Sequence, residues 1–142
     1  MKFLLDTDHL SVLTHRSGAD YAVLSLQIDS QTAGDVCVSV VSIQEQILGA
    51  NALIANFRQP KNLLRGYEIV HILAETYRRF TVVPFDAAAL AEFDRLKALK
   101  LRVGTMDPRI AATALARGLT VVTRNDRDFA HVPGLKVEDW TR

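Results

Sequence analysis

Features that identify several common protein classes are missing from this sequence. It holds a single cysteine, so no disulfide can form within the chain, and Cys37 lies in an apolar run where we expect a small buried side chain. No apolar run approaches the ~18 residues of a membrane span, so we expect no membrane partner. An acid at position 6 interrupts the apolar N-terminus before a signal-peptide core could form, and we expect a cytoplasmic protein.

Motifs for nucleophilic or phosphate-loop chemistry are also missing. The sequence has no glycine-rich phosphate loop and no Gly-x-Ser-x-Gly turn. His9, His15, His71 and His131 lack the spacing of metal ligands, and we interpret them as exposed or hydrogen-bonded histidines. The net charge of +1 does not by itself indicate a nucleic-acid partner, although the mildly basic second half of the chain would tolerate a polyanion.

The order of apolar segments predicts an α/β fold. Short apolar runs alternate with segments of helical periodicity, which is typical of a mostly parallel sheet covered by helices. With 142 residues and neither a linker nor a repeat, the chain is expected to form one domain over 1–142. We expect strands at 2–5, 36–41, 81–83, 119–123 and 135–137, helices at about 8–15, 19–30, 42–57, 60–77, 87–99 and 108–117, and a loop at 103–106.

Acidic residues stand close to the ends of several predicted elements. They are Asp6 and Asp8 after the first strand, Glu45 after the second, Asp107 before the last long helix, and Asp126 and Asp128 after the fourth strand. Parallel strands share one carboxyl edge, where open α/β sheets bind ligands. Acids gathered there would repel one another unless a cation such as Mg²⁺ or Mn²⁺ neutralised them. Such a cation could activate water for phosphodiester hydrolysis.

Each acid taken alone also has a structural interpretation. Asp8 can cap the first helix, and Asp107 can cap the helix that follows it. Glu45 can complete a capping box with Ser42 at the start of the third helix. Asp6 ends a buried strand and has no evident capping role, so it is the strongest candidate for a cation ligand.

Five motifs follow one another along nearly the whole chain. They are Leu4-Leu5-Asp6-Thr7-Asp8, Ser39 to Glu45 followed by Gly49, Gly104 to Ala112, Val122 to Phe129, and Val132 to Trp140. In this order and spacing they resemble the PIN-domain ribonucleases, and among them the VapC-type toxins of bacterial toxin–antitoxin pairs.

This resemblance implies a PIN-like α/β/α sandwich with a mostly parallel central sheet of four to five strands. It also implies a Mg²⁺- or Mn²⁺-dependent endoribonuclease that cleaves an RNA, whether tRNA, rRNA or mRNA. The protein would form a homodimer and would be restrained by a VapB-type antitoxin. An apolar face on the helix from Pro60 to Tyr77 could receive that antitoxin.

The resemblance assigns catalytic roles to four acids. Asp6 and Asp107 would be the direct cation ligands, while Glu45 and Asp128 would bind a second ion or hold its waters, and one of them could act as a general base. Some relatives instead place the fourth acid where this chain has Asn125. Asp126 falls on a variable position of the family, and as a loop acid it ranks below Asp128.

Further residues are expected around these acids. Thr7, Thr123 and Asn125 would hydrogen-bond to the ligands, and Asp8 stands where relatives more often have Asn, which leaves it a small extra role. The basic residues Arg109, Arg124 and Arg127 are either RNA-phosphate contacts or solvated charges. Trp140 is expected to pack rather than to stack on a base.

Two other functions are compatible with parts of the sequence. Asp6-Thr7-Asp8 resembles the nucleophile motif of haloacid-dehalogenase phosphatases, but Leu10 stands where that family has Thr or Val, and no lysine opens a later helix as expected. A non-catalytic RNA- or antitoxin-binding PIN domain is the second alternative. The presence of all four acids disfavours it.

Overall fold

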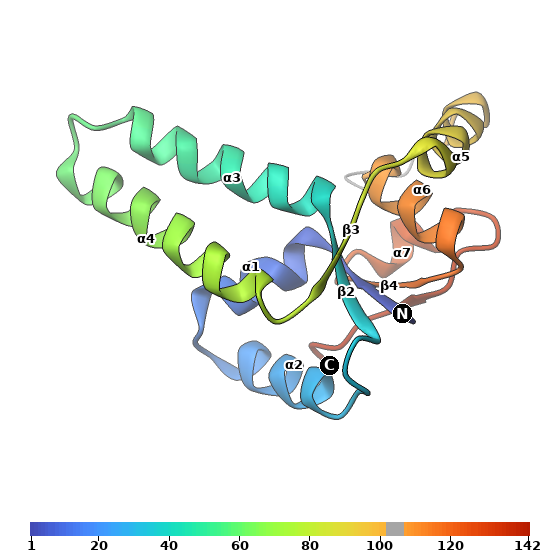
Figure 1. Ribbon diagram of the computed structural model, residues 1–142, viewed down its shortest axis with the longest axis horizontal. Coiled ribbons are helices and arrows are strands. Elements are labelled where there is room, and N and C mark those ends of the chain that lie inside the picture. Colours follow the sequence, from blue (N-terminus) through green and yellow to red (C-terminus); the bar gives the residue numbers. More distant parts are fainter. Residues whose placement is uncertain (102–106) are drawn as a thin grey trace.

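The chain folds around a parallel β-sheet (Figure 1). The computed structural model describes residues 1–101 and 107–142, so the loop expected at 103–106 lies outside the described residues. The strands are β1 (Phe3–Leu5), β2 (Val36–Ser39), β3 (Thr81–Val83), β4 (Thr120–Val122) and β5 (Val137–Glu138), in the order β3-β2-β1-β4-β5. Every neighbouring pair is parallel, which confirms the predicted fold class.

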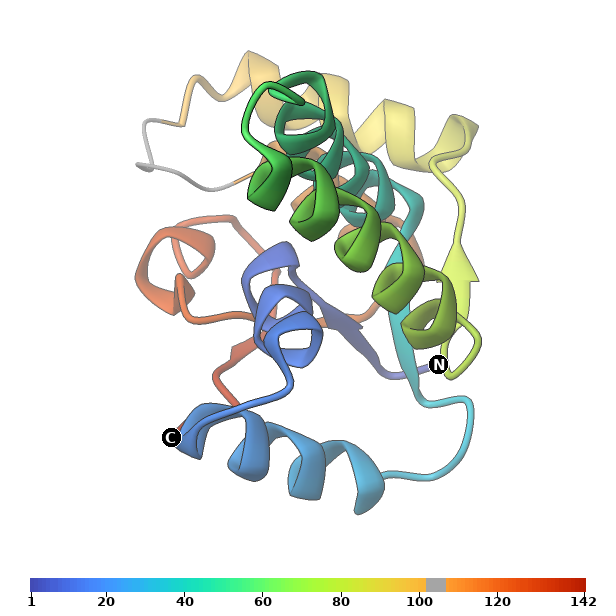
Figure 2. The same cartoon turned by 90° about the vertical axis from the view of Figure 1, so that its left-hand side faces the viewer.

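Helices cover both faces of this sheet. They are α1 (Thr7–His15), α2 (Ala19–Asp29), α3 (Val40–Ala55), α4 (Pro60–Tyr77), α5 (Ala87–Ala98), α6 (Pro108–Arg117) and α7 (Asp126–Phe129). The single turn α7 is not predicted by the apolar pattern of the sequence. The α3–α4 hairpin projects away from the sheet, whereas α2 lies below it and α5 and α6 lie on the opposite side (Figures 1 and 2). None of the helices in residues 1–101 and 107–142 has the length and apolar character needed to cross a membrane.

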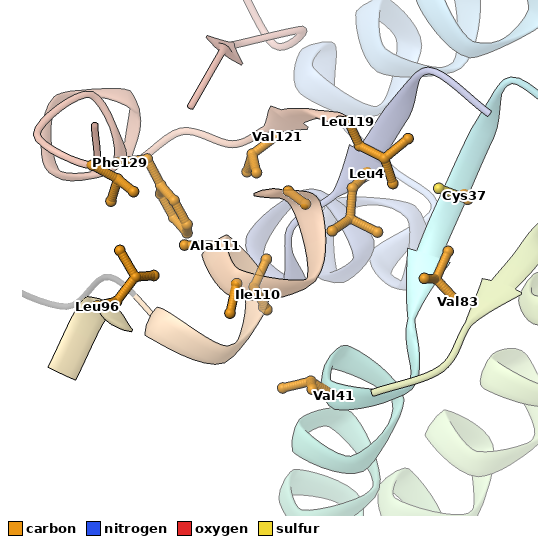
Figure 3. Packing of buried hydrophobic residues seen from close by; sticks show 13 residues of the cluster. Leu4, Cys37, Val41, Val83, Leu96, Ile110, Ala111, Leu119, Val121 and Phe129 are labelled. Carbon is orange, nitrogen blue, oxygen red and sulfur yellow. The ribbon is translucent and has the colours of Figure 1, made fainter. Parts of the chain in front are cut away.

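Strand β1 lies at the centre of the sheet and contributes to two hydrophobic clusters, one on each face of the sheet. Leu4 belongs to the same hydrophobic cluster as Ile110 and Phe129, on the α5–α6 side (Figure 3), and Leu5 belongs to the same cluster as Leu10, on the α1–α2 side. Both strand residues are completely buried. Because a parallel sheet with two covered faces needs apolar residues throughout its strands, the first polar side chain after β1 lies at the carboxyl edge.

The predicted cap of the first helix is wrong. Asp6, not Asp8, is the N-cap of α1, and its Oδ1 accepts a hydrogen bond from the Thr7 N–H at 2.7 Å. Asp6 has the extended backbone that an N-cap requires, because it directly continues β1. Asp6 therefore does have a capping role, contrary to the sequence-based expectation, and Asp8 lies inside the helix.

The predicted start of the third helix is also wrong. Strand β2 ends at Ser39 rather than at Val41, and the Ser39 hydroxyl accepts from the Val41 N–H at 3.0 Å as the cap of α3. The β-branched residues after Ser39 favour a strand locally, but the earlier cap turns them into the first helical turn. Ser42 lies buried inside α3, so the capping box with Glu45 does not form.

The caps of α6 agree with the prediction. Asp107 accepts a hydrogen bond from the Arg109 N–H at 2.8 Å, and Pro108 occupies the first turn. Gly118 ends the helix with a φ of 65°, a left-handed conformation that glycine adopts without strain. This cap places the Asp107 carboxylate at the N-terminus of α6.

The α3–α4 hairpin depends on a close approach at Gly66. A Cβ at this position would lie 2.6 Å from Ile54 Cγ1 and 3.0 Å from the Ala50 carbonyl oxygen. We therefore expect Gly66→Ala to lower the free energy of unfolding by about 1–3 kcal/mol, since overpacking outweighs the better helix propensity. Gly49→Ala is the control, because nothing lies within 4 Å of its Cβ, and it should stabilise by about 0.5–1 kcal/mol. Urea unfolding checks both, and equal effects would contradict the proposed close contact.

Candidate active site

A pocket of about 500 Å³ opens at the carboxyl edge of the sheet. It brings together three acids from distant parts of the chain: Asp6 after β1, Glu45 from α3 and Asp107 before α6. Among the described residues, the lining consists of Asp6, Thr7, Asp8, Glu45, Phe93, Asp107, Pro108, Arg109 and Asn125. Three of the four acids predicted to be catalytic therefore line one pocket at this edge, where open α/β sheets bind ligands.

Asp6 is held by hydrogen bonds on both carboxylate oxygens and is 9% exposed. Oδ1 accepts from the Thr7 N–H, and Oδ2 accepts from the Thr123 hydroxyl at 2.8 Å. Burial, followed by the negative charge of Asp8, raises the pKa of Asp6 to about 6, although the bonds from Thr123 and Thr7 oppose this shift. A buried carboxylate in such surroundings favours binding a proton or a cation.

The carboxyl groups of Glu45 and Asp107 lie close enough for each to shift the pKa of the other. Burial, followed by the hydrogen bond to Asp107, raises the pKa of Glu45. Burial also opposes ionisation of Asp107, but the hydrogen bonds from Glu45 and Arg109 outweigh it and lower the pKa of that carboxyl. Glu45 is therefore the more easily protonated of the two, and its Oε2 accepts from the Thr7 hydroxyl at 2.7 Å.

Arg109 places a positive charge beside both carboxylates. Its Nε lies 3.2 Å from Asp107 Oδ1 and its Nη2 lies 3.1 Å from Asp107 Oδ2, while Glu45 Oε1 is 3.5 Å from Nη2. The guanidinium thus partly neutralises two of the candidate ligands. Its side chain is 45% exposed, so it can also move toward solvent or a bound polyanion.

Arg109→Ala is expected to tighten binding of Mn²⁺ to the pocket by about fivefold, because the carboxylates lose a competing cation of modest strength. Isothermal titration calorimetry of the RNA-free protein measures the dissociation constant. Arg124→Ala is the control, since the Arg124 guanidinium bonds to Asp20 outside the pocket. Weaker Mn²⁺ binding by Arg109→Ala would contradict this account of the charge.

Asp8 lines the pocket but directs its oxygens at other protein groups. Oδ2 accepts from the Arg124 N–H at 3.0 Å and lies 3.1 Å from the Thr123 hydroxyl, and Oδ1 lies 2.8 Å from Nδ1 of His9. Burial raises the pKa of Asp8, but the bonds from His9, Arg124 and Thr123 prevail and lower it. These bonds favour the charged form of Asp8, and the extra role suggested by the sequence stays a prediction.

The candidates for the fourth acid occupy different places. Asp128 lies half-buried on α7 and is not among the residues that line the pocket, whereas Asn125 is. Asp126 Oδ1 lies 3.7 Å from Nη2 of Arg142, near the C-terminus. A cation role for Asp128 stays a prediction.

Some residues of the site have no clear sequence signal. Phe93 lines the pocket from α5, but its apolar spacing in the sequence indicates only a helix that packs on the core. His9 is completely buried and hydrogen-bonded. Only its position directly after Asp6-Thr7-Asp8 could have indicated from the sequence that it lies near the site. Trp140 packs against Phe3 with ring centroids 4.8 Å apart, which agrees with the predicted packing role.

The predicted apolar face on α4 is present. The exposed apolar residues there are Leu64, Tyr67 and Val70. Binding of an antitoxin to this face stays a prediction.

The oxygen donors of the pocket fit a hard divalent cation. They are carboxylates, a threonine hydroxyl and an asparagine amide, which suit Mg²⁺ or Mn²⁺ rather than a thiophilic metal. Within residues 1–101 and 107–142, no three acidic, histidine or cysteine side chains are arranged to hold one ion together. The ion would therefore take one or two carboxylates and keep several waters, as Mg²⁺ commonly does.

Comparison with known proteins identifies the family. The PIN-domain model matches residues 3–135. The chain is 30% identical to the tRNA(fMet)-specific endonuclease VapC of Shigella flexneri, over 99% of both proteins. It is 28% identical to the protein of the same name from Salmonella typhimurium, over 99% of this chain and 98% of that protein. The crystal structure of DNA-bound VapBC from Salmonella typhimurium superimposes with a TM-score of 0.74 at 27% identity, covering 99% and 98% of the two chains. The chain therefore belongs to the PIN-domain family. Within that family it is a VapC-type protein.

Proposed function

We propose that this protein is the ribonuclease toxin of a type II toxin–antitoxin pair, and that it cleaves RNA phosphodiester bonds with Mg²⁺ or Mn²⁺. The observation that carries this proposal is the meeting of Asp6, Glu45 and Asp107 in one pocket of a VapC-type PIN domain. The haloacid-dehalogenase alternative has no comparable support, since the family match covers residues 3–135 as a PIN domain.

Each acid has a proposed part in the reaction. Asp6 and Asp107 would hold the cation, and Glu45 and Asp128 would hold a second ion or its waters. When bound, the cation acidifies a water molecule and stabilises negative charge on the phosphate. Thr123 and Thr7 keep the carboxylates of Asp6 and Glu45 in place through hydrogen bonds of 2.8 and 2.7 Å.

The substrate and partners follow from the named relatives. The Shigella flexneri relative is named for tRNA(fMet), so tRNA is the first RNA to test, followed by rRNA and mRNA. The Salmonella typhimurium structure contains VapB with VapC, and we propose a VapB-type antitoxin for this chain as well. Formation of a homodimer belongs to the same proposal.

The test is cleavage of total RNA by the purified protein with Mg²⁺ or Mn²⁺, with the products mapped by sequencing their ends. Cleavage should stop in EDTA and return when the cation is added back. Cleavage that continues in EDTA would refute the cation dependence. A protein that cuts no RNA in either cation would refute the ribonuclease proposal, and phosphate transferred covalently to Asp6 would support the phosphatase instead.

Asp128→Asn is expected to slow RNA cleavage by about tenfold, because a group outside the pocket lining acts through water or a neighbouring ligand. Asp126→Asn is the matched control on the same helix turn and should cleave within about twofold of the wild-type rate. Initial rates at saturating Mn²⁺ measure both. Equal rates for the two variants would remove Asp128 from the site.

A further inference from the structure

His9 is a buried polar residue that the proposed reaction does not use. Its side chain is completely buried, and both ring nitrogens have partners. The Trp140 N–H donates to Nε2 at 3.2 Å, so this nitrogen is an acceptor. The ring hydrogen therefore lies on Nδ1, which donates to Asp8 Oδ1 at 2.8 Å.

Asp8, which is held by His9, in turn forms hydrogen bonds with residues that directly follow β4. Its Oδ2 accepts from the Arg124 N–H at 3.0 Å and faces the Thr123 hydroxyl at 3.1 Å. The same hydroxyl lies 2.8 Å from Asp6 Oδ2. Because a hydroxyl carries one hydrogen, Thr123 shares it between the two carboxylates, and the place of Asp8 helps decide the direction of that bond.

We infer that His9 and Asp8 are positioning residues that fix the Thr123 hydroxyl and the Asp6 carboxylate, and thereby set the cation affinity of the pocket. The inference rests on the proposed function, since it concerns the same site. The hydrogen-bonded series runs from Trp140 through His9, Asp8 and Thr123 to Asp6.

Two physical reasons support a role beyond packing. Burying a histidine in an apolar core costs free energy unless both ring nitrogens are hydrogen-bonded. Here one of the two bonds, from Nδ1, is made to the carboxylate of Asp8 beside the pocket. Asp8 also adds a second negative charge next to Asp6, and negative charge held by the protein attracts a cation. Removing the Asp8 charge, or the His9 bond that orients it, should weaken cation binding.

Two histidine substitutions separate the two bonds of the ring. In His9→Asn the amide nitrogen can replace Nδ1 as the donor to Asp8, whereas in His9→Gln the amide oxygen can replace Nε2 as the acceptor from Trp140. Asp8→Asn removes the charge but keeps the size of the side chain. His15→Gln is the control, because His15 is an exposed histidine of the same helix.

Mn²⁺ binding to the RNA-free full chain, measured by calorimetry, is the primary readout, and thermal unfolding in EDTA is the second. We expect about tenfold weaker binding in Asp8→Asn and His9→Gln, the size of effect typical of groups that orient ligands. His9→Asn should bind within about threefold of wild type although it loses the contact to Trp140 and melts earlier. His15→Gln should match the wild type in both measurements.

A purely structural role predicts a different pattern. If Mn²⁺ affinity follows melting temperature across the variants, or if His9→Gln and Asp8→Asn bind Mn²⁺ as the wild type does, the inference is overturned. RNA cleavage by the weakened variants should recover at high Mn²⁺ concentration, and cleavage that stays low at saturation also overturns it. A wild-type protein that binds Mn²⁺ but cuts no RNA would refute the proposed function, while the affinity ratios would still decide the inference.

Discussion

Replacing Asp6 by Asn is expected to reduce RNA cleavage by about 10³-fold, because the cation loses a charged ligand that contributes several kcal/mol to stabilising the transition state. The fold should persist. Asn is as good an N-cap as Asp, and its side-chain oxygen can accept the same hydrogen bond from the Thr7 N–H. Single-turnover cleavage at saturating Mn²⁺ measures the loss. Asp29→Asn, which alters an exposed carboxylate on α2, is the control and should leave the rate unchanged.

The same variant should change how stability depends on pH. The pKa of Asp6 is raised from 3.8 to about 6 in the folded protein, so the native state binds more protons than the unfolded chain between these values. Stability from this group is complete below pH 4 and is lost as the pH rises through about 6. A shift of this size corresponds to roughly 2–3 kcal/mol at pH 8.

Asp6→Asn does not ionise, so without a cation it should be more stable than wild type at pH 8 and similar to it at pH 4. Urea unfolding in EDTA at several pH values tests this difference. Adding Mg²⁺ at pH 8 should stabilise the wild type much more than the variant, because the cation binds the native site and not the unfolded chain. A variant that is less stable than wild type at every pH would show that Asp6 serves the fold rather than a cation.

Asp107→Asn is expected to reduce cleavage by a similar factor of about 10³, since Asp107 is the second proposed direct ligand. The alternative is that Asp107 only caps α6 through its bond to the Arg109 N–H. Asn preserves that cap, so the substitution removes the charge and leaves the helix start intact.

Asp86→Asn is a matched control for this experiment. Asp86 is the N-cap of α5, accepts from the Ala89 N–H at 3.0 Å and does not line the pocket. Both variants make the same chemical change at a helix N-cap, and only one of the two carboxylates lies in the pocket. Cleavage should be lost in Asp107→Asn and kept in Asp86→Asn. If both variants retain the wild-type rate, Asp107 is a cap and not a ligand.

Local patterns identified most elements but misplaced two helix starts. The periodicity of apolar residues predicts α2, α4 and α5 within one to two residues of their observed ends. The caps of α1 and α3 were assigned two or three residues too late, to Asp8 and Ser42 instead of Asp6 and Ser39. Good capping residues stand at both the predicted and the observed positions, and the choice depends on where the neighbouring strand leaves the sheet.

The sequence by itself determined the α/β class and the meeting of Asp6 and Glu45, because parallel strands deliver their following residues to one edge whatever their exact lengths. Asp107 opens a helix instead of following a strand, and the resemblance to PIN-domain ribonucleases grouped it with these acids. The resemblance named Thr7 and Thr123 as hydrogen-bonding partners of the acids, but only the tertiary structure decided which acid each one holds. The Thr123 bond to Asp6 joins residues 117 apart in sequence, and the His9 bond to Trp140 spans 131. No local periodicity encodes such pairs, since they depend on the order of strands in the sheet and on the side on which the chain returns. His9 shows no metal-ligand spacing in the sequence, but the fold places its Nδ1 against the carboxylate of Asp8, which lines the pocket.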